Sequence, residues 1–399
     1  MVSASKPLDG VRVVDLSQVV SGPYATMILA EQGADVVKVE PLGTGDPIRE
    51  TAIRRGNTSS LYLNLNRGKR SIAVDVQSEA GRAIVLDLMA GADVVVQNFR
   101  PGVVDRLGLG YAEARARNAG VVYVSISGYG PDGPHAHRPI YDPIIQALVG
   151  VVARQQSEAI PLPDLVRNVM IDKATALTVA QAVCAALVRS GRTGQGDHLV
   201  IPMLDVGMYF FWPDGMADFT FVGDGAEPGP RIADVYKLTR CIDGQIVHFE
   251  GTYAQLFGLY RTIGHPEMEH DPRYNGADGK LSADSWGYID GVVEQAFSEM
   301  TVAAAVEALH AAGVPAAPVN EPHQVIEDPQ VVHNQSLHTW DHPVAGTLRQ
   351  PRHPVRFASS PTPVLEFVDA LGERTDEILL ELGRSQTEIE ELRSAGIVA

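Results

Sequence analysis

The chain of 399 residues is long enough for two or three domains, and its 45% hydrophobic and 20% charged residues are ordinary for a globular protein. A formal net charge of −17 argues against nucleic acid or an anionic membrane as partner, because both would repel an acidic surface. The opening MVSASKPLDG lacks an apolar secretion signal, and only two cysteines occur. We therefore expect a cytoplasmic protein without a membrane span or a disulfide framework.

Strand-like and helix-like segments alternate along roughly the first 130 residues, a pattern typical of a parallel sheet with helices on both faces. The predicted fold class is therefore α/β with a Rossmann-like layer. The β-branched runs and the helical patterns between them are 11–17, 22–34, 35–40, 70–76, 78–92, 93–99, 110–119 and 121–127.

The remaining chain divides at a Gly/Pro-rich stretch, Val222–Arg231, which has the composition of a linker. Before it, Lys173–Gly191 has helical spacing, with one predicted buried face of Ala174, Leu177, Ala180, Cys184 and Leu187. After it, a hairpin around Asp243-Gly244 and helices to about Ala312 predict an α+β module. Two short C-terminal helices are expected on either side of Gly383.

A glycine pattern after the run 121–127 imitates a dinucleotide-binding loop, since Gly128, Gly130 and Gly133 spell G-x-G-x-x-G. That motif works by opening a helix at the pyrophosphate, and the prolines that follow prevent a helix here. We interpret the segment as a turn-rich loop at the carboxyl end of a parallel strand, where open α/β sheets form their ligand crevice.

Few of the usual catalytic signatures are present. Cys184 and Cys241 lie in apolar stretches without a histidine partner, and we interpret both as packing residues. His135 and His137 form H-x-H without further ligands, so an exposed loop is favoured over a metal site. We expect no bound metal.

Asp172 is a candidate with two interpretations, because it stands between an apolar run and the long helix. The first is a helix N-cap, a role that aspartate fills well. The second is a nucleophile, since a positioned and partly desolvated carboxylate can attack an activated acyl carbon. Pattern alone favours the cap.

A resemblance changes this balance. PLDGVRVVDLSQVVSGPYATMILAEQGADVVKVEPLGTGDPIR, LNRGKRSIAVDVQSEAG, DVVVQNFRPGVVDRLGLGY, SISGYGPDGP, RSGRTGQGDHLVIPMLD and GVPAAPV occur in the order found in class III coenzyme A transferases, the CaiB/BaiF family. The sequence resembles that family almost from end to end. The resemblance implies an interlocked homodimer. Each chain would have a large Rossmann-like domain from residues 1–222 and 330–399, and a smaller α+β domain at 223–329.

The resemblance also implies a reaction. Asp172 occupies the place of the family's catalytic carboxylate, which attacks an acyl-CoA and passes coenzyme A to a small carboxylic acid through covalent intermediates. Acyl-CoA and the acid are then substrates, and no tightly bound cofactor is expected. Gln18 and Tyr141 match positions of the catalytic site.

Further matching positions are expected to bind CoA. Val19 would contact the region of the thioester, and Asn98 and Arg106 would hold the CoA moiety. Lys69 and Arg70 match a basic turn near the nucleotide, although solvated surface charges explain this pair equally well.

Three departures from the family pattern leave alternatives open. Pro41 follows Glu40 where formyl-CoA transferases have arginine, Ile171 replaces the usual glycine before the catalytic aspartate, and FEGTYAQL stands where those enzymes have a glycine-rich lid. We therefore do not expect an enzyme specific for oxalate. An α-methylacyl-CoA racemase is the alternative enzyme, although that branch has histidine at the Tyr141 position, and tyrosine is a poor base near neutrality. A catalytically idle CoA-binding protein is the other alternative.

Overall fold

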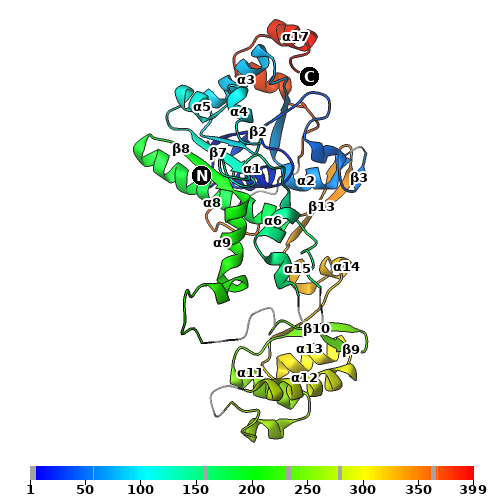
Figure 1. Cartoon of the computed structure of the whole chain (residues 1–399). Coiled ribbons are helices and arrows are strands. Elements are labelled where there is room, and N and C mark those ends of the chain that lie inside the picture. Colours follow the sequence, from blue (N-terminus) through cyan, green and yellow to red (C-terminus); the bar gives the residue numbers. More distant parts are fainter. Residues whose placement is uncertain are drawn as a thin grey trace. The chain divides into compact units, whose positions relative to one another are not determined.

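The computed structural model describes residues 6–56, 58–156, 160, 162–227, 229, 235–276, 281–360, 365 and 367–399. Figure 1 shows the chain with its secondary structure. It forms two compact units, one from residues 1–222 and 335–399 and the other from residues 223–334. The division falls near the expected positions 223 and 329, while the independence of the smaller unit as a domain stays a prediction.

A six-stranded parallel sheet forms the centre of the first unit. Its spatial order β5-β2-β1-β6-β7-β8 is the order 3-2-1-4-5-6 of a Rossmann-type sheet, so the α/β prediction with a parallel sheet is confirmed. The strands are β1 (Arg12–Asp15), β2 (Asp35–Glu40), β5 (Lys69–Ala73), β6 (Val94–Gln97), β7 (Val122–Ser127) and β8 (Asp197–Pro202).

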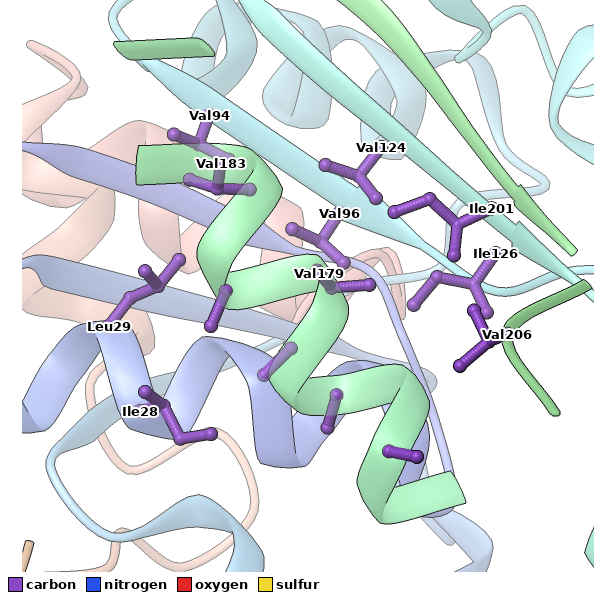
Figure 2. Close-up of a cluster of buried hydrophobic side chains, with 14 of the residues drawn as sticks. Ile28, Leu29, Val94, Val96, Val124, Ile126, Val179, Val183, Ile201 and Val206 are labelled. Carbon is purple, nitrogen blue, oxygen red and sulfur yellow. The ribbon is translucent and has the colours of Figure 1, made fainter. Parts of the chain in front are cut away.

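One face of this sheet packs against α1 (Ser21–Glu31) and α8 (Met170–Thr193). Figure 2 shows Val179 and Val183 of α8 beside the valines of β6 and β7. The predicted helix 173–191 is therefore present, but its predicted buried face is partly wrong, because Leu177 is 58% exposed. By length and composition α8 could also cross a membrane, yet here it is the core helix of the unit.

The opposite face of the sheet is covered by helices from both ends of the unit. The buried cluster joins Ile84 of α3 (Glu79–Ala90) and Ala114 of α5 (Tyr111–Arg117) to Ile378 and Ile389 near the C-terminus. Figure 1 shows α17 beside α3, although about three hundred residues of chain separate them. The two C-terminal helices, α16 (Thr375–Glu381) and α17 (Gln386–Ser394), are confirmed on either side of Gly383.

Shorter elements complete the first unit. They are a 3₁₀ turn (Pro47–Glu50), β3 (Arg54–Arg55), β4 (Thr58–Ser59), α2 (Ser60–Asn66), α4 (Val103–Arg106), α6 (Asp142–Leu148), α7 (Val151–Arg154), α9 (Met203–Gly215), a 3₁₀ turn (Ala217–Phe219), β12 (Leu337–His342) and β13 (Gly346–Pro351). The β12–β13 hairpin packs on α2 through Trp340, so the chain returns to the first unit after residue 335.

The second unit has a three-stranded antiparallel sheet in the order β11-β10-β9, with helices and its own buried core. The predicted hairpin is present, but its turn is Ile242–Asp243, because Gly244 already pairs with Cys241. The elements are β9 (Thr239–Cys241), β10 (Gly244–His248), α11 (Tyr253–Thr262), a 3₁₀ turn (Pro266–His270), α12 (Ala283–Ser298), α13 (Val302–Ala311), β11 (Ala316–Pro318), α14 (Pro322–Val325) and α15 (Pro329–His333).

Candidate active site

The carboxyl edge of the parallel sheet brings Gln18 and Asn98 together. Chain order reverses between β1 and β6, which is where open α/β sheets form their ligand crevice. The Asn98 amide lies after β6 and binds the loop that follows β1. Its Oδ1 accepts from the Gln18 backbone N–H at 2.8 Å, and its Nδ2 donates to the Gln18 carbonyl at 2.6 Å. The structure thus shows Asn98 holding a loop, while direct contact with CoA stays a prediction.

The next residue of this loop has an unusual backbone. Val19 has φ of +71°, a left-handed conformation that strains a β-branched residue. Its N–H donates to Oδ1 of Asp46 at 3.1 Å. Gly22 allows the start of α1 to approach the loop, because a Cβ there would lie 2.2 Å from Cβ of Ser17. The loop is therefore fixed by its surroundings in a conformation that it would not adopt alone.

Asp172 is the third residue of α8, so the predicted N-cap role is wrong: the helix begins at Met170 and Val169 occupies the cap position. The cap is supplied by Asp142 at the start of α6. Its Oδ2 accepts from the backbone N–H groups of Ile171 at 2.7 Å and Asp172 at 2.9 Å. The Asp172 carboxylate is thereby left free for another partner, and it accepts a hydrogen bond from Ser21.

The Ser21 contact joins the predicted residues into one site. Ser21 is the first residue of α1 and follows Gln18 and Val19 by a few positions. The Asp172 carboxylate therefore lies beside the strained loop that Asn98 holds. The side-chain amide of Gln18 has no hydrogen-bond partner within the described part of the chain. Three predicted elements, the β1 loop, Asn98 and the start of α8, thus meet at the carboxyl edge of the sheet.

The electrostatic surroundings favour a reactive form of Asp172. Burial and, to a smaller extent, the nearby negative charge of Asp142 together raise the pKa of this carboxyl to about 7, against a still smaller lowering by the Ser21 hydrogen bond. Near neutral pH the group is then present in both protonation states. A carboxylate with so high a pKa is a better nucleophile than an ordinary surface aspartate, and a good acid or base as well.

Sequence reasoning missed Asp142. Its side chain is 2% exposed, and Gln146 one turn later in α6 donates to it. Gln146 also donates to the Asn168 carbonyl at 3.0 Å and accepts from Val166 at 3.0 Å, so α6 fixes the segment that leads into α8. The sequence contained one signal, an acid followed by proline, which is typical of the first turn of a helix.

Tyr141 occupies the N-cap position of α6, next to Asp142. Its side chain is 69% exposed, and among the described residues its phenol makes no hydrogen bond. A catalytic role for Tyr141 therefore stays a prediction. The rejection of a dinucleotide fingerprint agrees with the structure, because no helix begins within 128–141 and Gly130 and Gly133 have positive φ as turn residues.

The expectation that Lys69 binds a CoA phosphate is contradicted by its surroundings, while the same expectation for Arg70 stays a prediction. Lys69 is 2% exposed, and its ammonium donates to Asp15 at 2.9 Å, to the Pro23 carbonyl at 2.8 Å and to Asn66 at 2.8 Å. Burial also lowers the pKa of Lys69 to about 8. A lysine with all three hydrogens donated inside the protein cannot bind a phosphate.

Arg70 is engaged as well, since its guanidinium binds Asp35 and two acids of α16. Both cations of this pair therefore join parts of the fold. Arg106 differs, because it is exposed at the end of α4 and makes no ion pair with the residues that the structure describes. Its role in binding CoA stays a prediction, and it is a better candidate for a phosphate than the Lys69–Arg70 pair.

The remaining candidate groups do not form a second centre. Burial raises the pKa of the Cys184 and Cys241 thiols, which disfavours the reactive thiolate. No group of three or more His, Cys, Asp or Glu side chains suited to a metal occurs in the described ranges, and His135 and His137 are not part of one. The geometry thus favours Asp172 as the reactive group.

Comparison with known proteins identifies the family. Residues 8–375 match the family described as CoA-transferase family III. The chain belongs to this family. It is 32% identical to succinyl-CoA:glutarate CoA-transferase of Mus musculus over 98% of this chain and 90% of that protein. It is also 32% identical to acetyl-CoA:oxalate CoA-transferase of Acetobacter aceti, over 90% of each chain.

A solved structure supports the same assignment. The crystal structure of a CAIB/BAIF family protein from Brucella suis has a TM-score of 0.81 and 29% identity, and covers 95% of this chain and 100% of that one. The mixed α/β fold with its parallel sheet is therefore that of the CaiB/BaiF proteins. CoA-transferases use CoA thioesters as substrates, so the family and its relatives support a CoA-transferase.

Proposed function

We propose that this CoA-transferase moves coenzyme A from an acyl-CoA to a small carboxylic acid through covalent intermediates on Asp172. The observation that carries the proposal is the placement of the Asp172 carboxylate. It lies at the first turn of α8 with its backbone N–H capped by Asp142, and it contacts Ser21 beside the strained Gln18–Val19 loop. Burial leaves it poorly solvated, which suits a carboxylate nucleophile.

The reaction proceeds by four acyl exchanges. A carboxylate oxygen of Asp172 attacks the thioester carbon, the carbon–sulfur bond breaks, and CoA thiolate leaves an acyl-aspartyl anhydride. The thiolate attacks the aspartyl carbon, which releases the donor acid and forms an aspartyl-CoA thioester. The acceptor carboxylate then displaces the thiolate to form a second anhydride. Finally the thiolate attacks the acceptor acyl carbon, which releases the new acyl-CoA and restores Asp172.

The surrounding residues support each exchange. Asp142 and Gln146 hold the start of α8 so that the carboxylate keeps its position when it is acylated. The Gln18 side chain is free to bind a substrate oxygen, and Asn98 fixes its backbone. Exposed Arg106 provides a cation for the CoA phosphates within an otherwise acidic protein.

The test is intact-protein mass spectrometry after mixing with succinyl-CoA, acetyl-CoA and formyl-CoA. The wild type is expected to gain the mass of an acyl group or of CoA, and Asp172→Asn is expected to gain neither. Asp164→Asn is the matched control, because Asp164 is an exposed acid shortly before α8 whose partners among the described residues are Arg167 and its neighbour Leu165. Adduct formation on Asp172→Asn would contradict the proposal. So would exchange of Cα hydrogen for deuterium in a 2-methylacyl-CoA without any adduct, the result expected of a racemase.

We also propose that the chain functions as a homodimer. Large apolar side chains lie exposed on α8, α9 and the segment after α9, and a monomer rarely leaves so many uncovered. They are Leu177, Val188, Met208, Tyr209, Phe210, Phe219, Phe221 and Val222. Light scattering coupled to size-exclusion chromatography is expected to give twice the chain mass, and a monomer mass at micromolar concentration would contradict the dimer.

A further inference from the structure

Four charged side chains are buried together beneath the Gln18–Val19 loop. They are Asp15, Lys38, Asp46 and Lys69, of which none is more than 2% exposed. Lys38 pairs with Asp46 at 3.0 Å, and Lys69 pairs with Asp15 at 2.9 Å. The quartet is electrically neutral as a whole, with two carboxylates and two ammonium groups.

Burying four charges is costly, because each loses its hydration and the ion pairs restore only part of that energy. Apolar residues of similar volume would often serve stability equally well. The quartet is therefore poorly explained as a device for stability alone. Its contacts with the neighbouring backbone provide another explanation.

The charged quartet binds the loop at successive backbone groups. The Lys38 ammonium donates to the Ser17 carbonyl at 2.9 Å, and Asp15 accepts from the Ser17 N–H at 2.9 Å. Asp46 accepts from the Val19 N–H at 3.1 Å with the same carboxylate that pairs with Lys38. The residue so held is Val19, the one with the left-handed backbone.

We propose that Lys38 and Asp46 are a positioning pair for CoA transfer, which holds Val19 in its strained conformation and so fixes Gln18 beside Asp172. The inference rests on the proposed function. Neither residue contacts substrate, because both are fully buried. They act through the loop: the lysine holds one side of it, the aspartate holds the other, and the ion pair joins the two.

Asp46→Asn is the first variant. An asparagine has one side-chain oxygen, so it cannot both face the Lys38 ammonium and accept from the Val19 N–H as the carboxylate does. We expect kcat with the donor that forms the adduct to fall about 10–100-fold with KM little changed, because a misplaced loop impairs the transition state more than binding. Hydrogen–deuterium exchange at the amides of residues 17–19 is expected to accelerate.

A second substitution distinguishes a role in positioning the loop from a general loss of stability. Glycine adopts positive φ without strain, so Val19→Gly no longer needs the carboxylate to hold it. The double variant Asp46→Asn/Val19→Gly is therefore expected to recover much of the kcat that Asp46→Asn loses. A purely structural role for Asp46 would gain nothing from a glycine at 19.

The matched control is Glu31→Gln, which breaks the buried pair of Glu31 with Arg67 at the other end of α1. It is expected to lower the melting temperature while the folded protein keeps its kcat. The proposal is overturned if Asp46→Asn keeps wild-type kcat and loop exchange, if Val19→Gly rescues nothing, or if Glu31→Gln lowers kcat as much. Absence of any adduct on the wild-type protein would instead overturn the proposed function, and with it this role.

Discussion

Two loops that follow strands of the same sheet are built in opposite ways. The loop after β1 is short and mostly buried, and the backbone of residues 17–19 is held by Asp15, Lys38, Asp46 and Asn98. The loop 128–141 after β7 is longer and mostly exposed, with turns at its glycines. Each leads into a helix whose first residue contacts the start of α8, Ser21 in one case and Asp142 in the other.

The difference suggests that the two loops have different roles around Asp172. A strained loop held by buried partners is pre-organised, so it suits the part of the site that must be the same in every turnover. An exposed loop with few fixed groups can change its sequence and shape at little cost to the fold, so it suits contact with a particular acid. We expect substitutions in the two loops to differ accordingly.

The largest effect is expected for Asn98→Ala, which removes both hydrogen bonds to the Gln18 backbone. The loop should lose its position, with kcat falling about 10–100-fold and the free energy of unfolding falling by about 1–3 kcal/mol. Steady-state kinetics and urea denaturation measure the two quantities. If kcat stays at the wild-type value while stability falls, the loop after β1 is not pre-organised for catalysis.

The next largest effect is expected at Asp142, which directly follows the loop 128–141. In Asp142→Asn the negative charge that helps to raise the pKa of Asp172 is gone, while the amide oxygen can still accept from the α8 N–H groups. The nucleophile must be ionised, so activity rises with pH through the Asp172 pKa of about 7 in the wild type. The acidic limb of the pH–rate profile should therefore move to lower pH. An unmoved limb would show that Asp142 does not tune Asp172.

A smaller effect is expected on stability. The pKa of Asp172 is about 7 when folded and near 4 when unfolded, so the folded state loses stability as pH rises between these values. Asp172→Asn removes that loss. The unfolding free energy of the variant should therefore exceed that of the wild type by about 1–3 kcal/mol more at pH 8 than at pH 5. Thermal or urea unfolding at both pH values measures it. If the difference between the variant and the wild type is the same at both pH values, burial does not raise the pKa of Asp172.

The smallest effect is expected for Gly133→Ala in the exposed loop. No atom lies within 4 Å of the added methyl group, and only the φ of +91° opposes it. Stability should fall by about 1 kcal/mol, and kcat should stay within about twofold. A loss of kcat as large as that of Asn98→Ala would remove the distinction between the two loops.

Sequence analysis predicted those parts of the site that depend on local sequence pattern or on resemblance to the family. Alternating strands and helices predicted the sheet, and the motif order predicted Asp172, Gln18 and Asn98. Lys69 was assigned wrongly because its buried partner Asp15 is distant in sequence. Asp142 was missed for a similar reason, since only tertiary packing brings α6 against the start of α8.

The helical face of α8 shows the same limit on a smaller scale. Steps of three and four residues placed Leu177 inside, yet that side chain is exposed while Val179 and Val183 face the sheet. The helix is apolar on most sides, so periodicity could not decide which stripe the sheet would cover.

The assembly of the first unit from two separated stretches also affects how the chain folds during synthesis. All six strands of the parallel sheet have been made by residue 202, but Ile378, Leu379 and Ile389, which cover one of its faces, follow much later. The part of the sheet face that these residues cover is therefore exposed to solvent while the ribosome synthesises the second unit. We expect the native state to form slowly and chaperones to be needed during that interval, because α16 and α17 complete the core of the first unit only after the rest of the sheet has been made.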